Sequence, residues 1–224
     1  MKKTLIIDCD GVLYPIADLP TRNIIDAVKD IYRNEVKISG EEQAMISAKT
    51  IKENHLGIFN YIREICNYSN YDFGKFCRQL AEKIDYSNIK EDKKLWNKFQ
   101  QVLPYAEIVI FTNNSREHVD MITRQLFHKS SEETEKSGVR IYDITATQVG
   151  GYFYPKQAPQ AFSMFLAKIG ANAENCILYD DAPRNLAMAR QAGIKGVLIN
   201  QDNTLLQNLQ VLISSLPKIQ HTRD

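Results

Sequence analysis

The sequence predicts an α/β protein with a Rossmann-like, doubly wound parallel sheet and a helical segment inserted after the first strand. Short apolar runs that end in polar residues alternate with amphipathic helical patterns, which is typical of a parallel sheet covered on both faces. Between about residues 20 and 99 no such run occurs, and apolar residues recur instead at helical spacing.

Length and composition fit one globular domain with an insertion, or two small domains. The chain has 224 residues, of which 44% are hydrophobic and 25% charged, and its formal net charge is +1. So small a charge provides no basic surface for nucleic acid or for an anionic membrane, and we expect neither as a partner. No apolar run approaches the roughly 18 residues that cross a bilayer.

The cysteines predict an intracellular protein. The four of them form no Cys-x-x-Cys pair, and two lie inside apolar strand-like runs, a pattern typical of reduced, buried thiols. Asp8 and Asp10 interrupt the first apolar stretch too early for a signal peptide. We therefore expect a soluble, cytoplasmic protein.

The first predicted strand, residues 5–7, leads into two carboxylates. Side chains alternate along a strand, so Asp8 and Asp10 should leave on one side and Cys9 on the other. Carboxylates so close repel each other unless a cation lies between them or one takes a proton. Ligands bind beyond the carboxyl ends of strands in open α/β sheets, so the stretch predicts a site for a hard cation such as Mg²⁺. Taken alone, the Asp-x-Asp-Gly pattern also fits a strand that simply ends in a turn, with no cation site.

The next eighty residues predict helices. Their apolar residues recur at helical spacing, and turn signals separate the segments at residues 39–40 and 67–72. The apolar positions are Ile24, Ile25, Val28, Ile31 and Tyr32, then Ile58, Tyr61, Ile62 and Ile65, then Phe73, Phe76, Leu80 and Ile84.

Beyond this block strands and helices alternate. Further strands are predicted over residues 106–113, 140–146, 176–179 and 196–200. Helices are predicted from Ser115, over residues 160–169 and over residues 186–193, followed by a short helix after the last strand. The charged, Ser-rich stretch 129–138 is expected to be a solvated loop.

Polar residues follow several of these strands or lie on loops nearby. They are Thr112 and Asn113, Lys156, and Asp180 and Asp181. Carboxylates with a hydroxyl and a lysine suit phosphate and a divalent cation, because the metal neutralises both carboxylates and phosphoryl oxygens. A carboxylate not fully used by the metal can attack phosphorus, and a second carboxyl can protonate the leaving oxygen and then activate water.

In this order, the motifs resemble the four signature motifs of the haloacid dehalogenase-like (HAD) hydrolases. The matching stretches are Asp8-Cys-Asp-Gly-Val, Ile-Phe-Thr112-Asn, Lys156 and Tyr-Asp-Asp181-Ala-Pro-Arg-Asn185. The resemblance covers essentially the whole chain and implies a HAD core of residues 1–16 and 98–224 with a C1-type helical cap over 17–97. Asp8 to Pro15, the Phe-Thr-Asn113 stretch with His118, and the Asp-Asp pair with Asn185 resemble the pyrimidine 5′-nucleotidase subgroup.

The resemblance implies roles for the first and third motifs. Asp8 would be the nucleophile that becomes the aspartyl phosphate, and would also bind the metal. Asp10 would be the general acid/base and would offer its backbone carbonyl to Mg²⁺. Gly11 would belong to the substrate-binding loop, and Lys156 would clamp Asp8 and the phosphate.

The second and fourth motifs would bind phosphate and metal. By the same resemblance, Thr112 and the backbone of Asn113 would hold the phosphoryl group. Asp181 would be a metal ligand, and Asp180 a supporting residue or an alternate ligand. Asn185 would orient the metal's waters.

The leading hypothesis is a Mg²⁺-dependent phosphatase that hydrolyses a small phosphomonoester, such as a pyrimidine nucleoside 5′-monophosphate. Two alternatives stay open: a phosphosugar mutase or phosphotransferase that passes the phosphoryl group on, and a catalytically silent protein that binds a phosphorylated ligand. We expect a monomer or homodimer. His55 and His118 are expected at helix surfaces. The Cys9 side chain is expected to be buried and to pack in the core.

Overall fold

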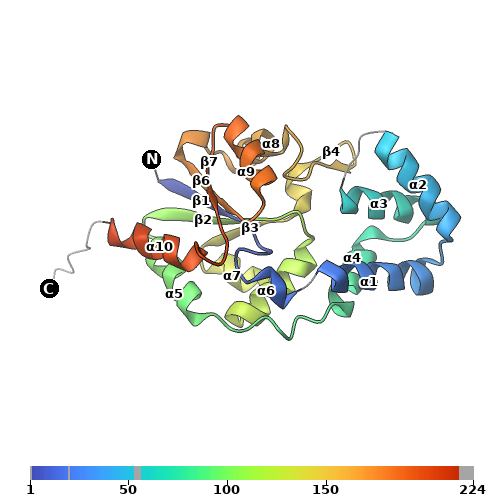
Figure 1. The fold of residues 1–224 in the computed structure, drawn as a ribbon, viewed down its shortest axis with the longest axis horizontal. Helices are drawn as coiled ribbons and strands as arrows, with labels where there is room; N and C mark the ends of the chain where they lie inside the picture. The colour runs from blue at the N-terminus through green and yellow to red at the C-terminus, as the bar shows by residue number, and fades with distance from the viewer. Residues whose placement is uncertain (1, 20, 53–56, 217–224) are drawn as a thin grey trace.

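The computed structural model describes residues 2–19, 21–52 and 57–216, and a parallel sheet forms its centre. The sheet has five strands in the order β3-β2-β1-β6-β7, and every neighbouring pair is parallel (Figure 1). The strands are β1 (Lys3–Ile7), β2 (Ala106–Phe111), β3 (Val139–Tyr142), β6 (Cys176–Asp180) and β7 (Lys195–Leu198). The predicted α/β fold class is confirmed.

Both faces of the central strand β1 are buried. Ile6 pairs in register with Val109 on one side and with Leu178 on the other. Leu5 and Ile7 point to the opposite face from Ile6, because side chains alternate along a strand, and all three are fully buried. A near-continuous apolar run is what a strand covered on both sides requires.

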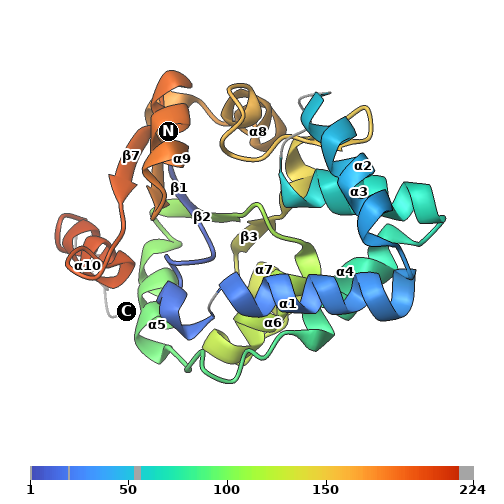
Figure 2. The ribbon, with the colours of Figure 1, turned by 45° about the vertical axis from the view of Figure 1, so that its right-hand side comes forward.

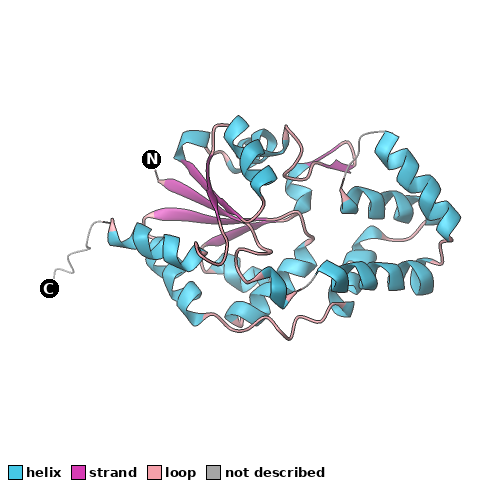
Figure 3. Cartoon of the chain, viewed as in Figure 1, coloured by secondary structure: helices cyan, strands magenta, loops and turns pink. Residues whose placement is uncertain are grey.

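Helices cover the two faces of the sheet in separate groups (Figures 1 and 3). On one face lie α8 (Ala161–Ile169) and α9 (Pro183–Gln191), with the short 3₁₀ turn η4 (Ala173–Asn175) before β6. On the other face lie α5 (Lys93–Val102), α6 (Arg116–Phe127), α7 (Ser131–Lys136) and α10 (Leu205–Ser214).

The remaining helices gather to one side of the sheet (Figure 2). They are α1 (Thr21–Ile31), α2 (Gly40–Lys52), α3 (Ile58–Ser69) and α4 (Phe73–Lys83), with η1 (Ile16–Asp18) before α1 and a π-helical turn η2 (Tyr32–Val36) after it. The expected domain boundary at residue 97 falls inside α5, which packs against β2 and α10. The division into core and cap stays a prediction.

A small antiparallel ribbon joins the sheet region to these helices. Its strands are β4 (Gln148–Val149) and β5 (Tyr152–Phe153), preceded by the 3₁₀ turn η3 (Ile144–Thr147). Gly150 and Gly151 turn the chain between the strands with φ values of 58° and 88°, which favour glycine. The ribbon leads directly into Lys156.

Two local predictions differ from the structure. The strand expected over 140–146 ends at Tyr142, because the Asp143 side chain accepts the Thr145 N–H and starts η3. The stretch expected to be a loop over 129–138 contains α7. Its first turn is closed by a capping box, in which Ser130 and Glu133 each accept the other's backbone N–H.

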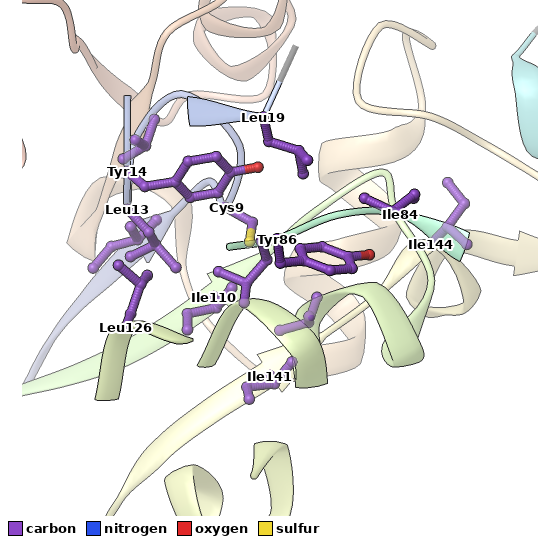
Figure 4. Close-up of a cluster of buried hydrophobic side chains, with 14 of the residues drawn as sticks. Cys9, Leu13, Tyr14, Leu19, Ile84, Tyr86, Ile110, Leu126, Ile141 and Ile144 are labelled. Atoms are coloured by element: carbon purple, nitrogen blue, oxygen red, sulfur yellow. The ribbon is translucent and has the colours of Figure 1, made fainter. Parts of the chain in front are cut away.

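The segment after β1 is packed into the core as closely as the strand itself. Cys9 lies among apolar side chains that include Leu13, Tyr14 and Tyr86 (Figure 4), and burial raises the pKa of its thiol. All four cysteines are buried and carry free thiols. Within the described residues, no helix combines the length and apolar character needed to span a membrane.

Candidate active site

Three neighbouring strands bring the expected site residues to one edge of the sheet. Asp8 and Asp10 follow β1, Thr112 follows β2, and Asp180 ends β6, with Asp181 next in the chain. Because β2, β1 and β6 are adjacent and parallel, their carboxyl ends meet at the same edge. Lys156 reaches this edge from the segment after β5.

A buried lysine joins two carboxylates at the centre of the site. Lys156 Nζ lies 2.6 Å from Asp8 Oδ1 and 3.0 Å from Asp180 Oδ2, and the lysine side chain has no exposed surface. Asp8 Oδ1 also accepts the Cys9 backbone N–H at 2.7 Å. A buried ammonium is stable only when anionic partners compensate for its lost hydration, and these two carboxylates do so.

Burial and neighbouring charges shift the pKa values of Asp8 and Lys156. Burial raises the pKa of Asp8, and the nearby carboxylates Asp180 and Asp10 raise it further, while Lys156 opposes them. Burial also works against the charged form of Lys156, but the attraction of Asp8 and Asp180 outweighs it and raises the lysine pKa. The lysine therefore remains an ammonium.

Asp180 is bonded through both carboxylate oxygens. Oδ1 accepts the backbone N–H of Ala182 at 2.9 Å, and the Asn185 amide donates to Oδ1 and Oδ2 at 2.9 and 3.1 Å. Together with Lys156, these contacts fix the orientation of a carboxylate that has no exposed surface. The Asn185 Oδ1 atom, also buried, has no partner among the described residues.

Asp181 lies against the backbone of Gly11. A Cβ atom on Gly11 would stand 2.2 Å from Asp181 Oδ2, so any other residue there would displace the carboxylate. Gly11 also has φ +75°, a conformation that other residues rarely adopt. Burial, and then repulsion from Asp180, raises the pKa of Asp181.

The acidic residues fit a hard divalent cation. Oxygen atoms of Asp8, Asp180 and Asp181 lie within 4.8 Å of one another, and the Lys156 ammonium contacts two of these carboxylates. Three carboxylates around one ammonium leave an excess of negative charge, which Mg²⁺ would neutralise with the oxygen ligands it prefers. The unpartnered Asn185 Oδ1 has the chemistry to accept a hydrogen bond from a metal-bound water.

Asp10 points away from this cluster into a separate network. Its Oδ1 accepts the Tyr14 hydroxyl and lies 2.8 Å from His118 Nε2, and its Oδ2 accepts the Asn114 amide at 2.6 Å. An ionised carboxylate can only accept, so Nε2 carries the proton of the histidine contact. In the neutral ring Nδ1 then accepts from the Tyr86 hydroxyl, 3.0 Å away.

This network explains the ionisation of Asp10. Burial acts against its charged form, but His118, Tyr14 and Asn114 together outweigh burial, and the pKa of Asp10 lies below its usual range. Burial and the Asp10 charge raise the pKa of the Tyr14 hydroxyl, which therefore stays a donor.

The prediction for His118 was wrong. It was expected at a helix surface, but it is buried on the inner side of α6, with only 4% of its surface exposed. The available signal was its position three residues after Ser115, whose side chain caps α6 by accepting the His118 N–H. His55 lies outside the described residues.

Thr112 and Asn113 form the side of the site that follows β2. Thr112 is buried, and its hydroxyl oxygen accepts the Asn114 backbone N–H at 3.1 Å. The Asn113 side chain accepts the Lys156 backbone N–H at 2.9 Å and donates to Gln157 at 3.3 Å. The sequence resemblance implied that the Thr112 hydroxyl and the Asn113 backbone bind the phosphoryl group. The structure adds that the Asn113 side chain anchors the backbone of Lys156.

The carboxylates and the buried lysine lie at the carboxyl edge of a parallel sheet, which is where open α/β proteins bind their ligands. Residues 2–193 match the family model described as haloacid dehalogenase-like hydrolase. The match covers most of the chain, so this protein belongs to the haloacid dehalogenase-like hydrolases. A comparison with curated proteins gives no match.

Solved structures show the same fold at low sequence identity. A 2-haloacid dehalogenase from Pseudomonas syringae pv. Tomato DC3000 is 15% identical, with a TM-score of 0.58 over 96% of this chain and 99% of that one. CbbY from Rhodobacter sphaeroides, in complex with phosphate, is 13% identical, with a TM-score of 0.55 over 92% and 89%. A HAD family enzyme from Bacteroides thetaiotaomicron, in complex with magnesium and inorganic phosphate, is 14% identical, with a TM-score of 0.53 over 89% and 95%.

Proposed function

We propose that the protein is a Mg²⁺-dependent phosphatase that hydrolyses small phosphomonoesters through an aspartyl phosphate on Asp8. The observation that carries this proposal is the fully buried Lys156 ammonium between Asp8 and Asp180, beside a third carboxylate, Asp181. This arrangement supports the proposal because it brings a candidate nucleophile, a buried positive charge and candidate cation ligands close together. Membership of the HAD-like hydrolases adds support.

In the first step Asp8 attacks the phosphorus atom. Asp8 Oδ1 already accepts from Lys156 and from the Cys9 N–H, so Oδ2 is the oxygen with room to form the new bond. As the Asp8–phosphorus bond forms, the bond from phosphorus to the leaving oxygen breaks. Asp10 is ionised in the free site, so it would first take up a proton from solvent, which the negative charge of the bound phosphoryl group favours. It would then act as general acid and give that proton to the leaving oxygen.

In the second step water completes hydrolysis. Asp10, now ionised, accepts a proton from a water molecule, whose oxygen attacks phosphorus as the bond to Asp8 breaks. Inorganic phosphate leaves, Asp8 is again a carboxylate and Asp10 again carries a proton. The donors from His118 and Tyr14 hold Asp10 in one orientation through both steps.

The remaining site residues bind charge. The Thr112 hydroxyl and the Asn113 backbone N–H would bind phosphoryl oxygens, and Lys156 would neutralise one of them. Asp8, Asp181 and the backbone carbonyl of Asp10 would hold Mg²⁺, which when bound supplies positive charge to the phosphoryl oxygens.

Asp180 has a supporting role in this proposal. Both of its oxygens are engaged by Lys156, Asn185 and the Ala182 N–H, so its first task is to orient the lysine. It would bind Mg²⁺ as an alternate ligand, because one of its oxygens belongs to the acidic cluster.

For the substrate we propose a nucleoside 5′-monophosphate, with a pyrimidine base as the first candidate. The support is the sequence resemblance of the first two motifs to the pyrimidine 5′-nucleotidase subgroup. In addition, a cavity of about 190 Å³ lies between α3 and Asn113, and Asn113 and Gln157 line it together with Phe59 and Phe153. Amide and aromatic groups suit a base, which presents hydrogen-bonding edges and flat faces.

Phosphate release from a panel of nucleoside monophosphates and sugar phosphates, with Mg²⁺ and with a chelator, tests the proposal. We expect Mg²⁺-dependent release that favours UMP or CMP. Release from other esters would keep the phosphatase and reject the nucleotide. No release from any member of the panel, in a folded sample that binds Mg²⁺, would contradict the phosphatase itself.

A further inference from the structure

The outer edge of the β4–β5 ribbon is closed by one side chain from helix α3. Asn60 Nδ2 donates to the Phe153 carbonyl oxygen at 2.7 Å, and the Phe153 N–H donates to Asn60 Oδ1 at 2.8 Å. Asn60 is 2% exposed, so both bonds are shielded from water. The carboxamide thus pairs with both polar groups of one backbone residue, as a neighbouring strand would.

The ribbon needs such a partner. A two-stranded ribbon is marginally stable by itself, and an unpaired backbone N–H or carbonyl away from water costs about as much as a lost hydrogen bond. In the register of the ribbon Phe153 pairs with Gln148, so Asn60 closes the edge that faces α3. Figure 1 shows the ribbon beside this helix.

Aromatic and cationic side chains strengthen the same contact. The Phe153 ring stacks on Phe73 of α4, with ring centres 5.5 Å apart and an angle of 30° between the planes. The Arg63 guanidinium of α3 lies 5.3 Å from the centre of the Phe153 ring and 5.8 Å from that of Phe73. Phe153 is 3% exposed, so α3 and α4 together enclose it.

The backbone beyond Phe153 is held firmly as far as Lys156. Tyr154 donates its N–H to the Thr147 carbonyl at 3.1 Å, and its own carbonyl accepts the Thr147 hydroxyl at 2.7 Å. The Lys156 N–H donates to Asn113 Oδ1 at 2.9 Å. Two residues separate Phe153 from Lys156, a span of at most about 11 Å, so little slack remains between the two anchors.

We propose that Asn60 is a positioning residue that sets the Lys156 ammonium between Asp8 and Asp180 by fixing β5 to helix α3. Lys156 then reaches its full contact with the nucleophile only while α3 is docked on the ribbon. The catalytic meaning of this contact rests on the proposed function, because it assumes that Lys156 serves a reacting Asp8. The structural link itself does not depend on that assumption.

Amide hydrogen exchange and lysine labelling test the link without any activity. In the wild type the Lys156 side chain is fully buried and should resist an amine-reactive reagent. In Asn60→Ala we expect faster exchange at the Phe153 and Lys156 amides, and labelling of Lys156 at least about tenfold faster. Asn34→Ala is the matched control, because Asn34 is an exposed amide of the same helical group that bonds only locally to Asp30.

A second variant keeps the proposal testable if Asn60→Ala does not fold. Asn60→Asp keeps the size of the side chain and the acceptor for the Phe153 N–H, but removes the donor to the Phe153 carbonyl. Circular dichroism would establish that each variant is folded. If Asn60→Ala does not fold, the same exchange and labelling measurements on Asn60→Asp decide the proposal.

Phosphate release kinetics give the catalytic readout. With p-nitrophenyl phosphate and saturating Mg²⁺ we expect kcat of Asn60→Ala to fall by about 10- to 100-fold, as a displaced catalytic group does. KM should change less than kcat, because Thr112 and Asn113 would still bind phosphoryl oxygens after Lys156 is displaced.

The outcomes separate the two proposals. Faster exchange confined to Phe153, with Lys156 still protected, would overturn the positioning role. Exposure of Lys156 in a wild-type-like fold supports it, even if the wild type releases no phosphate, in which case only the proposed function fails. An unchanged kcat in a variant whose Lys156 is labelled would keep the structural link and overturn the catalytic role given to Lys156 in the proposed function.

Discussion

Asp8 and Asp10 are separated by one residue but lie in opposite environments. Asp8 contacts a lysine in a cluster of three carboxylates, and burial raises its pKa. Asp10 is surrounded by the donors His118, Tyr14 and Asn114, which lower its pKa. Strand alternation alone would put both side chains on one face, but β1 ends at Ile7, before either residue. The segment beyond the strand, which turns at Gly11 with positive φ, gives the two carboxylates different partners.

The comparison teaches that two neighbouring carboxylates receive different tasks from their surroundings. The region around Asp8 is rich in negative charge and suits a cation and a phosphoryl group. The region around Asp10 supplies hydrogen-bond donors from His118, Tyr14 and Asn114, which hold an ionised carboxylate in one orientation. Titratable groups whose surroundings push their pKa values apart are typical of acid and base assignments in enzymes.

Replacement of Lys156 should have the largest effect on the Asp8 region. Lys156→Met leaves Asp8 and Asp180 buried without their counter-ion, so the free energy of unfolding in chelator should fall by about 3–5 kcal/mol. Added Mg²⁺ should recover a part of this loss, about 2.7 kcal/mol at a hundredfold excess over its Kd. Urea unfolding measures both values.

Lys168→Met serves as the control for that experiment, because Lys168 lies in the last turn of α8, away from the cluster. An equal loss of stability in both variants would contradict the role given to Lys156. So would a Lys156→Met protein that gains nothing from Mg²⁺.

Replacement of Gly11 should weaken the metal side without touching the Asp10 donors. In Gly11→Ala the new Cβ would stand 2.2 Å from Asp181 Oδ2, so the carboxylate must move. We expect the Mg²⁺ concentration for half-maximal phosphate release to rise by about 10- to 100-fold. Gly150→Ala carries similar backbone strain, with φ +58° and no atom within 4 Å of the new Cβ, and should leave the Mg²⁺ requirement unchanged.

Removal of one donor should have the smallest effect and a distinct pH dependence. Tyr14→Phe takes one hydrogen bond from a charged carboxylate, which costs about 1.5–3 kcal/mol of unfolding free energy at pH 7. The folded pKa of Asp10 is lowered, so its ionised form contributes stability above the unfolded pKa of about 3.9, and this is lost as pH falls through the folded pKa. The cost of Tyr14→Phe should therefore persist below about pH 4 and shrink only as the pH falls toward the lowered folded pKa of Asp10.

Urea unfolding in chelator at pH 7 and at about pH 2 measures this dependence. Tyr68→Phe is the control, since the Tyr68 hydroxyl donates to Glu42 at an exposed site, where a change within about 0.5 kcal/mol is expected. A cost of Tyr14→Phe that is the same at both pH values would show that the hydroxyl does not act through ionised Asp10.

The sequence predicted the part of the site that follows from strand order. Asp8, Thr112 and Asp180 each follow an apolar run, and parallel strands bring their carboxyl ends together. Lys156 follows no strand of the main sheet and was predicted only because it completed the set. Its complete burial is a tertiary feature that no local pattern reports.

The donors around Asp10 could not be predicted in the same way. His118 and Tyr86 come from different segments, and a histidine in the first turn of an amphipathic helix fits a surface position as well as a buried one. The contact made by Asn60 could not be predicted either, since its partner Phe153 lies 93 residues further along the chain. By contrast, α7 could have been predicted from a local signal, the capping box formed by Ser130 and Glu133. The high charge of the surrounding stretch led to the prediction of a loop instead.

The central claim is that Asp8 carries the phosphoryl group during turnover. The most direct measurement is to quench the turning-over enzyme with borohydride, which reduces an acyl phosphate but not a free carboxylate, and to locate the reduced residue by mass spectrometry. We expect modification at Asp8 that requires both substrate and Mg²⁺ and that is absent in Asp8→Asn, a variant that should fold normally and release no phosphate. Phosphate release by Asp8→Asn, or reduction at a different residue, would contradict the account.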